Sequence, residues 1–379
     1  MRPTTPAHEQ YTQFSCPNPA CARFNRPGEG NIAHRSWTGT HQPIERLRCP
    51  VWTRAFSQRE GSLRARSKLP EETVERLLKC QRRGRGDAGT ADLCGVDIKT
   101  VHRCQRVAAP RAQAHHEQLT RDLEVQGVHV DEKHAKRRGP RVEWRHTAIA
   151  MRSRFLLGVH WGPRTPERAA LLIAPVVARR CRVPVWLSDG WQADPAALLP
   201  VLGLVYQRCR RGTRGRHPKP RLVPPRELFY GQLVKVREAT GHLLHVVSQV
   251  VSGGPRRFCR EMERRGLGAT IHTAFMERWY GTLRGLCAPL RRRTRGGSSS
   301  QSRHHARVWL LVDLYNLVLP PKSLRQQGQP RTPALVIGLA AHVWSDRDDL
   351  WYPVHPDPLG RQLMQQRVKE LLMPALQAG

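Results

Sequence analysis

Short apolar runs follow one another from about residue 120 onward, each bounded by polar or turn-forming residues. Rich in Val, Ile, Leu and aromatic residues, these runs predict four strands, at 125–131, 143–151, 154–161 and 183–189. The apolar spacing from Pro166 to Arg180 predicts a helix between the third and fourth strands. This order of strands and helix predicts an α/β sheet.

A second β-rich stretch lies further along the chain. Residues 232–254 predict a hairpin with its turn at Thr240 and Gly241, and we expect it to form an insertion in the sheet domain. Two long helical patterns follow, from about 273 and from about 302.

The chain before the sheet divides into two regimes. Residues 1–67 are rich in Pro, Gly, Cys and Arg with few aliphatic residues. This composition is typical of a small module that needs a cross-link, such as a bound metal ion, for stability. Residues 68–112 turn helical, with Val74, Leu77 and Leu78 on one face after a Pro-Glu-Glu start.

Residues 89–105 have the pattern of a helix-turn-helix. Ala91 allows close packing of the first helix, Gly95 permits a sharp turn, Asp97 can cap the second helix, and Val101 anchors it. The alternative is an ordinary helical hairpin in a basic protein. If the motif binds DNA, the side chains available to a groove are Lys99, Thr100, His102 and Arg103.

Three cysteines near the amino terminus have part of the spacing of a zinc finger. Cys16 and Cys21 lie in CPNPAC, and Cys49 follows in RCPVW. A structural zinc site takes four nitrogen or sulfur ligands, but Trp52 stands where a second knuckle would place its last sulfur. His34 or His41 could substitute, and nothing in the spacing selects either. Zinc binding and three buried or reactive thiols therefore both stay open.

The charge balance points to a polyanionic partner. The 379 residues include 64 Lys and Arg against 30 Asp and Glu, a formal charge of +34, which excludes an acidic or neutral metabolic enzyme as the default. Such an excess favours DNA or RNA as partner, although an Arg-rich composition supplies part of it. No secretory signal core or membrane-length apolar run is present, so we expect a cytoplasmic, nucleoid-associated protein with no membrane partner.

Three carboxylates stand out in so basic a chain. Asp131 and Asp189 each close a predicted strand, and Glu277 lies near the apolar side of a predicted helix. Singly, the aspartates are most simply turn formers or caps, and Glu277 a partner of Arg278 or Arg284. Together, two strand-end acids and one helical acid can hold two Mg²⁺ ions for attack on a phosphodiester.

The chain resembles DDE transposases of the insertion-sequence-one family across nearly its full length. The motifs that carry the resemblance, in order, are CPNPAC with a downstream RC, GVDIKTV, HVDE, WLSDG, HTAFMERWYGTLR followed by RRRT, DLYN, and RTPALVIGLAAHVW. The most specific are ERxxxxxR followed by RRxT, then YN and TPAxxxGL.

The resemblance implies cleavage and joining of an element's terminal inverted repeats. It implies that Asp131, Asp189 and Glu277 form the metal-binding triad, with Mg²⁺ or Mn²⁺ as cofactor. It also implies that the amino-terminal module and the helix-turn-helix recognise double-stranded DNA at the element ends, and that a homo-oligomer bridges two ends. Trp52 departs from the family, which has its last finger cysteine there.

The sequence also suggests positions for two further acids and roles for four arginines that follow Glu277. We expect Glu132, next to Asp131, to point to the opposite face as an outer or solvated residue, and Asp313 to be a helix-surface charge. Basic residues that would contact DNA backbone, or in part orient Glu277, are Arg278, Arg284, Arg292 and Arg293.

The predicted architecture is a ribonuclease H-like α/β catalytic domain with a β-rich insertion, preceded by a zinc-finger-like module and a helix-turn-helix. The predicted ranges are 1–67 for the zinc-finger-like module, 68–112 for the helix-turn-helix, 120–320 for the catalytic domain and 321–379 for a carboxyl-terminal helical tail. The predicted function is a DNA transposase. The rivals are a non-catalytic DNA-binding regulator derived from one, and a nuclease of the same fold.

Overall fold

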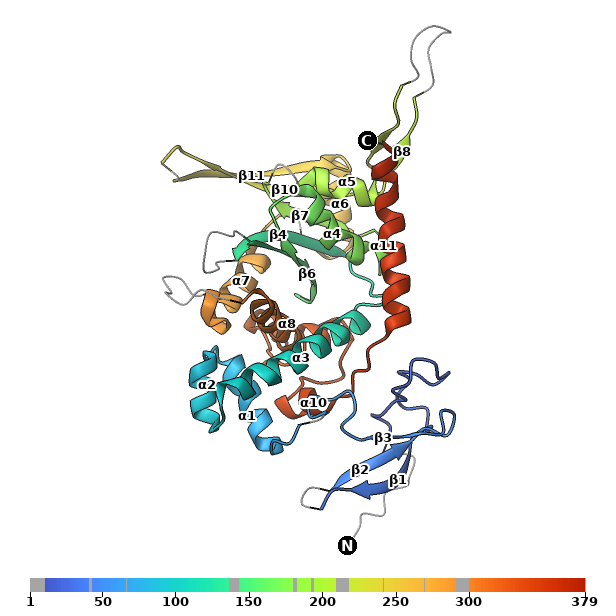
Figure 1. Cartoon of the computed structure of the whole chain (residues 1–379). Coiled ribbons are helices and arrows are strands. Elements are labelled where there is room, and N and C mark those ends of the chain that lie inside the picture. The colour runs from blue at the N-terminus through green and yellow to red at the C-terminus, as the bar shows by residue number, and fades with distance from the viewer. Residues whose placement is uncertain are drawn as a thin grey trace.

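The computed structural model describes most of the chain, and a mixed six-stranded sheet lies at its centre (Figure 1). The described residues are 11–40, 43–65, 67–135, 143–179, 183–191, 194–208, 218–240, 242–268, 270–290 and 300–378. The strands of the central sheet are β4 (Gly127–Ala135), β5 (Glu143–Ala150), β6 (Leu156–Gly162), β7 (Val185–Asp189), β10 (Tyr230–Arg237) and β11 (Leu243–Ser252).

The four strands predicted after residue 120 are all present, so the α/β prediction is confirmed at this level. The sheet order is β11-β10-β7-β4-β5-β6, with β4, β7 and β10 parallel and the remaining pairs antiparallel. The strand boundaries differ from the predicted ones by at most two residues, except at the end of β4, which does not close at Asp131 but stays paired with β5 as far as Ala135.

The predicted hairpin forms, but it is not a separate insertion. β10 pairs in parallel with β7, with Tyr230 opposite Trp186 and Leu233 opposite Asp189, and β11 pairs on its outer side. The hairpin pattern is local in the sequence, whereas its pairing partner lies over 40 residues earlier and leaves no local trace. Of the two predicted turn residues, Thr240 lies in a turn and Gly241 falls outside the described residues.

The outer strand β11 is unusual in its exposure. Leu243, Leu244, Val246, Val247 and Val251 are all at least 38% exposed. β11 ends the strand order, so its outer edge has no further strand among the described residues.

Helices cover both faces of the central sheet. Trp186 on β7 is fully buried in the main core, which includes residues of α4 (Pro166–Ala178), α5 (Asp194–Leu202), α7 (Ala274–Leu286) and α8 (Gln301–Leu317). Its neighbour Leu187 points into a smaller core with Phe258 and Met262 of α6 (Pro255–Arg264). The alternation along β7 thus sends successive side chains into two separate cores.

Three helices precede the sheet, α1 (Glu71–Arg82), α2 (Asp87–Cys94) and α3 (Ile98–Leu119). As predicted, Gly95 turns the chain in a left-handed conformation (φ 62°), and the Asp97 side chain caps α3 by accepting from the Lys99 backbone N–H. Val101 is fully buried. α3 runs to Leu119, beyond the predicted end at 112, because its apolar face continues and packs against α8.

The amino-terminal module is a small antiparallel sheet, made of β1 (Ala33–Thr38), β2 (Ile44–Arg48) and β3 (Ala55–Ser57). Its core is small: Phe14, Ile32, Leu47 and Phe56 pack with two of the cysteines. A core of this size is marginal on its own, so the module needs a further source of stability.

The carboxyl-terminal segment is only partly helical. It contains the short α9 (Pro333–Val336) and α10 (Asp346–Trp351) and the long α11 (Pro358–Ala378), which packs against α4 and α5. A two-stranded sheet of β8 (Leu204–Tyr206) and β9 (Arg221–Val223) lies near α11, and single 3-10 turns occur at η1 (Ala288–Leu290) and η2 (Lys322–Leu324). Among the described helices, none combines the length and apolar character that crossing a membrane requires.

Asp313 corrects one expectation. Instead of a surface charge on α8, its carboxylate is buried and accepts from His115 Nδ1 at 3.1 Å, and Arg111 lies 3.7 Å away. Arg111 also donates to Asp349 at the start of α10. The buried ion network therefore ties α3 and α8 to the carboxyl-terminal segment.

The turn between α2 and α3 offers a matched pair of substitutions. Neither Gly89 nor Gly95 has an atom within 4 Å of an added Cβ, so only backbone conformation distinguishes them. We expect Gly95→Ala to lower the free energy of unfolding by about 1 kcal/mol, because its φ is left-handed. Gly89→Ala, inside α2, should raise it by about 0.5 kcal/mol. Urea denaturation measures both, and the same sign for both variants would contradict the turn geometry.

Candidate metal centres

Parallel pairing of β4 with β7 brings two of the predicted acids together. The register places Val130 opposite Ser188, so Asp131 and Asp189 are the next residues of adjacent strands. Carboxylate oxygens of Asp131, Glu132 and Asp189 all lie within 4.8 Å of one another, a spacing that could hold a metal ion. Asp189 also accepts from the Trp191 backbone N–H at 3.3 Å.

Glu132 belongs to this acidic cluster, contrary to the expectation that it points away. It is only 5% exposed, and Arg164 Nε donates to its Oε1 at 2.7 Å. β7 ends at Asp189 while β4 continues, so the longer Glu132 side chain has room beyond the end of β7. The Arg164 guanidinium is itself held over the rings of Trp144 and Trp191, at 4.8 and 4.9 Å.

The acidic cluster favours protonation. Burial, together with repulsion from Asp189 and Glu132, raises the pKa of Asp131 well above its ordinary value. Burial and the Asp189 charge raise the pKa of Glu132 to about 7, against the opposing effect of Arg164. The cluster therefore resists full ionisation near neutral pH unless a positive charge joins it.

Glu277 stands outside the cluster. Its carboxylate does not share the 4.8 Å spacing, and its side chain is 57% exposed. Glu277 Oε1 accepts from Lys235 Nζ at 2.5 Å and from Thr273 Oγ1 at 3.3 Å, and the Lys235 hydrogen bond lowers the pKa of Glu277. The predicted inward position is wrong because the buried side of α7 consists of Met276, Trp279, Tyr280 and Leu283.

The helix that carries Glu277 nevertheless packs over the acidic cluster. The Tyr280 hydroxyl, one turn further along α7, donates to the backbone oxygen of Asp131 at 3.0 Å. Arg145, fully buried on β5, lies 5.4 Å over the Tyr280 ring. The Tyr280 hydrogen bond therefore fixes α7 to β4 at Asp131.

His129 is a further site residue that the sequence analysis missed. It lies on β4 two positions before Asp131, is fully buried, and neither ring nitrogen has a hydrogen-bond partner among the described residues. Burial, then the nearby His272, lowers its pKa to about 3, so the ring is neutral. The sequence signals that could have found His129 and Lys235 are weak, because each is one of several polar positions in its strand.

Of the basic residues predicted around Glu277, the two that the structure describes do not pair with it. Arg278 is exposed and Arg284 half-buried, and in the described part of the chain neither forms an ion pair with Glu277, whose partner is Lys235. Arg292 and Arg293 lie outside the described residues.

The three amino-terminal cysteines form a second group that could hold a metal. Sulfurs of Cys16, Cys21 and Cys49 lie within 4.8 Å of one another, with Cys16 and Cys49 fully buried. Burial raises the pKa of Cys16 to about 12. Burial alone would do the same at Cys49, but backbone N–H donors from Trp52 and Val51 outweigh it and hold the pKa of Cys49 below its ordinary value.

No fourth ligand completes the cysteine group among the residues described. Trp52 packs against the small core around the cysteines. His34 Nδ1 pairs instead with Glu45 Oε1 at 2.8 Å, and His41 lies outside the described residues. The arrangement is thus three sulfurs with an apolar neighbour.

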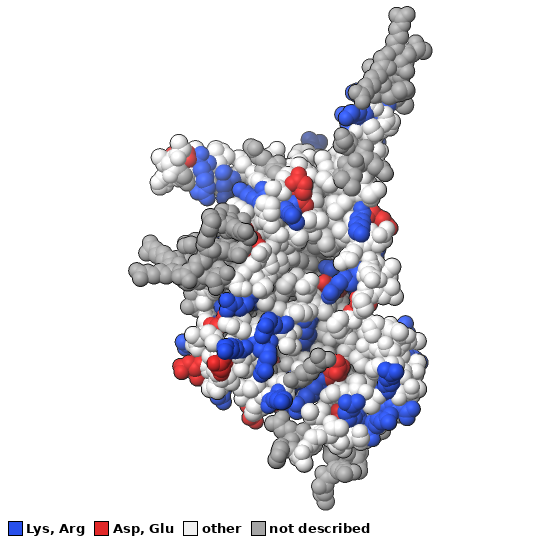
Figure 2. All heavy atoms as spheres, in the orientation of Figure 1, with Lys and Arg blue, Asp and Glu red and all other residues white. Residues whose placement is uncertain are grey.

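The predicted helix-turn-helix contacts divide into two groups. Lys99 and Arg103 are exposed on α3, whereas Thr100 and His102 are half-buried. His102 Nε2 lies 3.3 Å from Asp87 Oδ2 and is also within reach of Arg303. Basic side chains gather over the lower half of the molecule in Figure 2, where Figure 1 places α1 to α3 and the amino-terminal sheet.

A scan of the chain against protein-family models found no match, and a search among curated proteins found no relative.

Glu132 predicts a pH dependence of stability in the absence of divalent cations. Its ordinary pKa is 4.5, and its folded value is about 7, so the folded state keeps a proton that the unfolded state loses. As the pH rises from 4.5 to 7, the free energy of unfolding should therefore fall by about 3 kcal/mol relative to that of Glu132→Gln. Urea denaturation in a chelator at both ends of the window measures it. A constant difference between the two proteins would contradict the shifted pKa.

Proposed function

We propose that this chain is a DNA transposase that cuts and joins the ends of an insertion element with divalent metal ions. The observation that carries the proposal is the meeting of Asp131 and Asp189 on adjoining parallel strands, where β7 ends, under the helix that bears Glu277. These are the three acids that the family resemblance implies. The charge of +34 fits a DNA substrate.

The sheet topology supports a ribonuclease H-like catalytic domain. The first strand of this sheet, β4, is central. On one side β5 pairs antiparallel to β4 and β6 antiparallel to β5, and on the other side β7 and β10 run parallel to β4. Ligands bind at the carboxyl ends of parallel strands in such sheets, and Asp189 lies at that end of β7 with Asp131 beside it on β4.

The acidic cluster fits a hard divalent cation such as Mg²⁺ or Mn²⁺. Its donors are all carboxylate oxygens, and their charges oppose one another in a buried setting, so a cation would compensate them. Asp131 and Asp189 would hold it. Bound there, the metal would activate a water or 3′-hydroxyl and stabilise the leaving oxygen of a phosphodiester.

The surrounding residues position these acids. Arg164 balances the charge of Glu132, and Tyr280 fixes the backbone of Asp131. Lys235 holds Glu277 outside the cluster. In the proposed function, a DNA phosphate competes for Lys235 and frees Glu277 to join the two aspartates.

DNA-end recognition falls to the amino-terminal half in this proposal. Exposed Lys99 and Arg103 at the start of α3 would contact a groove or its phosphates. The cysteine group would hold Zn²⁺ and so staple the small core of the first module.

The second candidate is a non-catalytic DNA-binding regulator. The outward position of Glu277 and the absence of a fourth sulfur at Trp52 favour it. A nuclease of the same fold is the third. Joined DNA products support a transposase, cut ends alone a nuclease, and bound but intact DNA a regulator.

Substitution of the three acids tests the catalytic proposal. Asp131→Ala, Asp189→Ala and Glu277→Ala should each reduce Mg²⁺-dependent cleavage and joining of element-end DNA by about a hundredfold or more, because each removes a metal ligand. Glu238→Ala, an exposed acid after β10, is the matched control and should retain activity. Full activity in the Asp189 variant would exclude the assigned metal ligands, and full activity in the Glu277 variant alone would exclude the release of Glu277 by DNA.

Replacement of Trp52 tests the zinc proposal. Trp52→Cys supplies a sulfur at the spacing of a second knuckle, so it should tighten Zn²⁺ binding about tenfold or more and give Co²⁺ the absorption of a four-thiolate site. Trp37→Cys, on the exposed face of β1, adds a thiol elsewhere and should change neither property. Purified wild-type protein that takes up no Zn²⁺ or Co²⁺ would contradict the proposal.

A further inference from the structure

A basic cavity lies on the side of the sheet away from the acidic cluster. It has a volume of about 530 Å³ and lies between α3, α4 and α11. Arg121 precedes β4 and Arg179 precedes β7, whereas the acids lie at the other ends of these strands. A ligand in this cavity would therefore not be the scissile phosphate, so the inference drawn from it does not rest on the proposed function.

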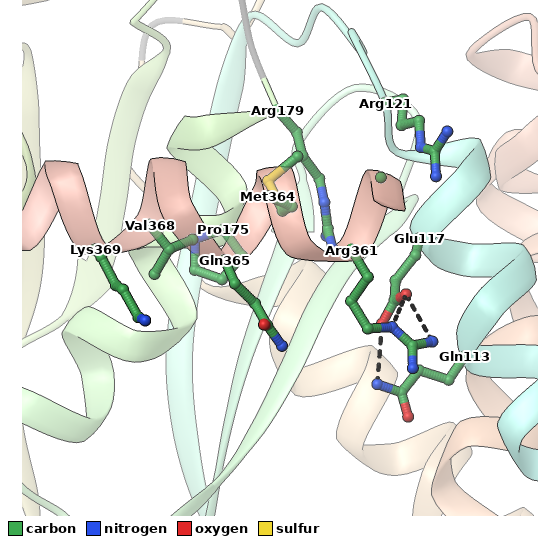
Figure 3. A pocket seen from close by; sticks show the side chains of 11 residues that line it. Gln113, Glu117, Arg121, Pro175, Arg179, Arg361, Met364, Gln365, Val368 and Lys369 are labelled. Atoms are coloured by element: carbon green, nitrogen blue, oxygen red, sulfur yellow. Dashed lines mark hydrogen bonds and ion pairs between the residues drawn. The ribbon is translucent and has the colours of Figure 1, made fainter. Parts of the chain in front are cut away.

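The cavity wall carries more positive than negative charge. Four basic residues line it, against Glu117 as the single lining acid: Arg121, Arg179, Arg361 and Lys369. Glu117 is already occupied, since Arg361 donates to its Oε2 from Nε and Nη2 at 3.2 and 3.1 Å and Gln113 donates to its Oε1 at 3.0 Å (Figure 3). Arg121 pairs with Asp357 at 2.6 Å.

Arg179 is the residue that points most directly to a ligand. Burial lowers its pKa, its Nε is buried without a hydrogen-bond partner in the described part of the chain, and no described acid lies within ion-pair distance. Figure 3 shows its side chain running from the end of α4 toward Arg361. The Glu117 carboxylate opposes the lowering of the Arg179 pKa from a distance, but it is held by Arg361. Arg179 therefore has no anion in direct contact among the described residues, and phosphate is the anion that its geometry matches best.

The rest of the lining suits more than a bare phosphate. Pro175 of α4 and Met364 and Val368 of α11 form an apolar side, and Gln365 lies between them with an amide that can both donate and accept. A volume of about 530 Å³ is within the usual range for sites of small organic ligands. An apolar side, an amide and a cluster of cations together match a ring system joined to phosphate.

We propose that the cavity between α3, α4 and α11 binds a nucleoside phosphate, with Arg179 and Arg361 on the phosphate and the apolar side of α11 against the ring. Because α11 packs on α4 and α5, the ligand would fasten the carboxyl-terminal helix to the helices around it. The site would thus sense a free nucleotide at a distance from the acidic cluster.

Titration of the full-length protein with ATP tests this proposal, with tripolyphosphate as the matched anion that lacks the nucleoside. ATP should bind saturably and more tightly than tripolyphosphate. Arg179→Gln and Lys369→Gln should each weaken ATP binding, Arg179→Gln by about tenfold, as expected for a lost charge-assisted hydrogen bond. Arg367→Gln on α11 changes the same charge outside the cavity and should leave binding unchanged.

Three results would overturn the proposal. Equal affinity for ATP and tripolyphosphate would remove the role of the apolar side. Equal weakening in the Arg367 and Lys369 variants would show non-specific attraction to a basic protein. Binding of a short DNA duplex that depends on Arg179, without any binding of ATP, would assign the cavity to DNA backbone instead. Lys369 is exposed, so its variant tests the cavity even if the Arg179 variant fails to fold.

Discussion

The parallel pairing of β4 with β7 is the constraint on which the rest of the site depends. It fixes Asp131 and Asp189 at the same edge of the sheet, where neither carboxylate can move away without breaking the central strands. The repulsion that results is large because the setting is buried. Arg164 offsets part of this repulsion by pairing with Glu132, and Tyr280 holds the Asp131 backbone in place.

Much of the sheet could be predicted from the sequence because its strands are continuous apolar runs. The two aspartates could be predicted for the same reason, since a charge after such a run is conspicuous. The place of β10 beside β7 could not, because pairing between distant segments depends on backbone geometry and not on local pattern. The insertion was therefore the natural but wrong interpretation of the hairpin.

The side-chain geometry of the site was less accessible to prediction. Strand alternation placed Glu132 on the far face from Asp131, but β7 stops at Asp189, and beyond its end the longer Glu132 side chain reaches the same cluster. Helical periodicity placed Glu277 near the apolar side, yet a position at the border of a helix face is decided by its neighbours, here Lys235. The turn between α2 and α3 was predictable in detail because Gly95 and Asp97 act locally.

The exposed edge strand β11 has a consequence for how the protein behaves in solution. Its sequence, LLHVVSQVVS, contains no Asp, Glu, Lys or Arg, so it lacks the charges that usually keep sheet edges apart. Copies of a chain with a charge of +34 repel one another at low salt, and this repulsion keeps the β11 edges of two copies from pairing. Added salt releases the protein from a polyanion, and the same salt screens the repulsion between copies. The salt concentrations that release the protein from a polyanion are therefore those at which the β11 edges of two copies can pair.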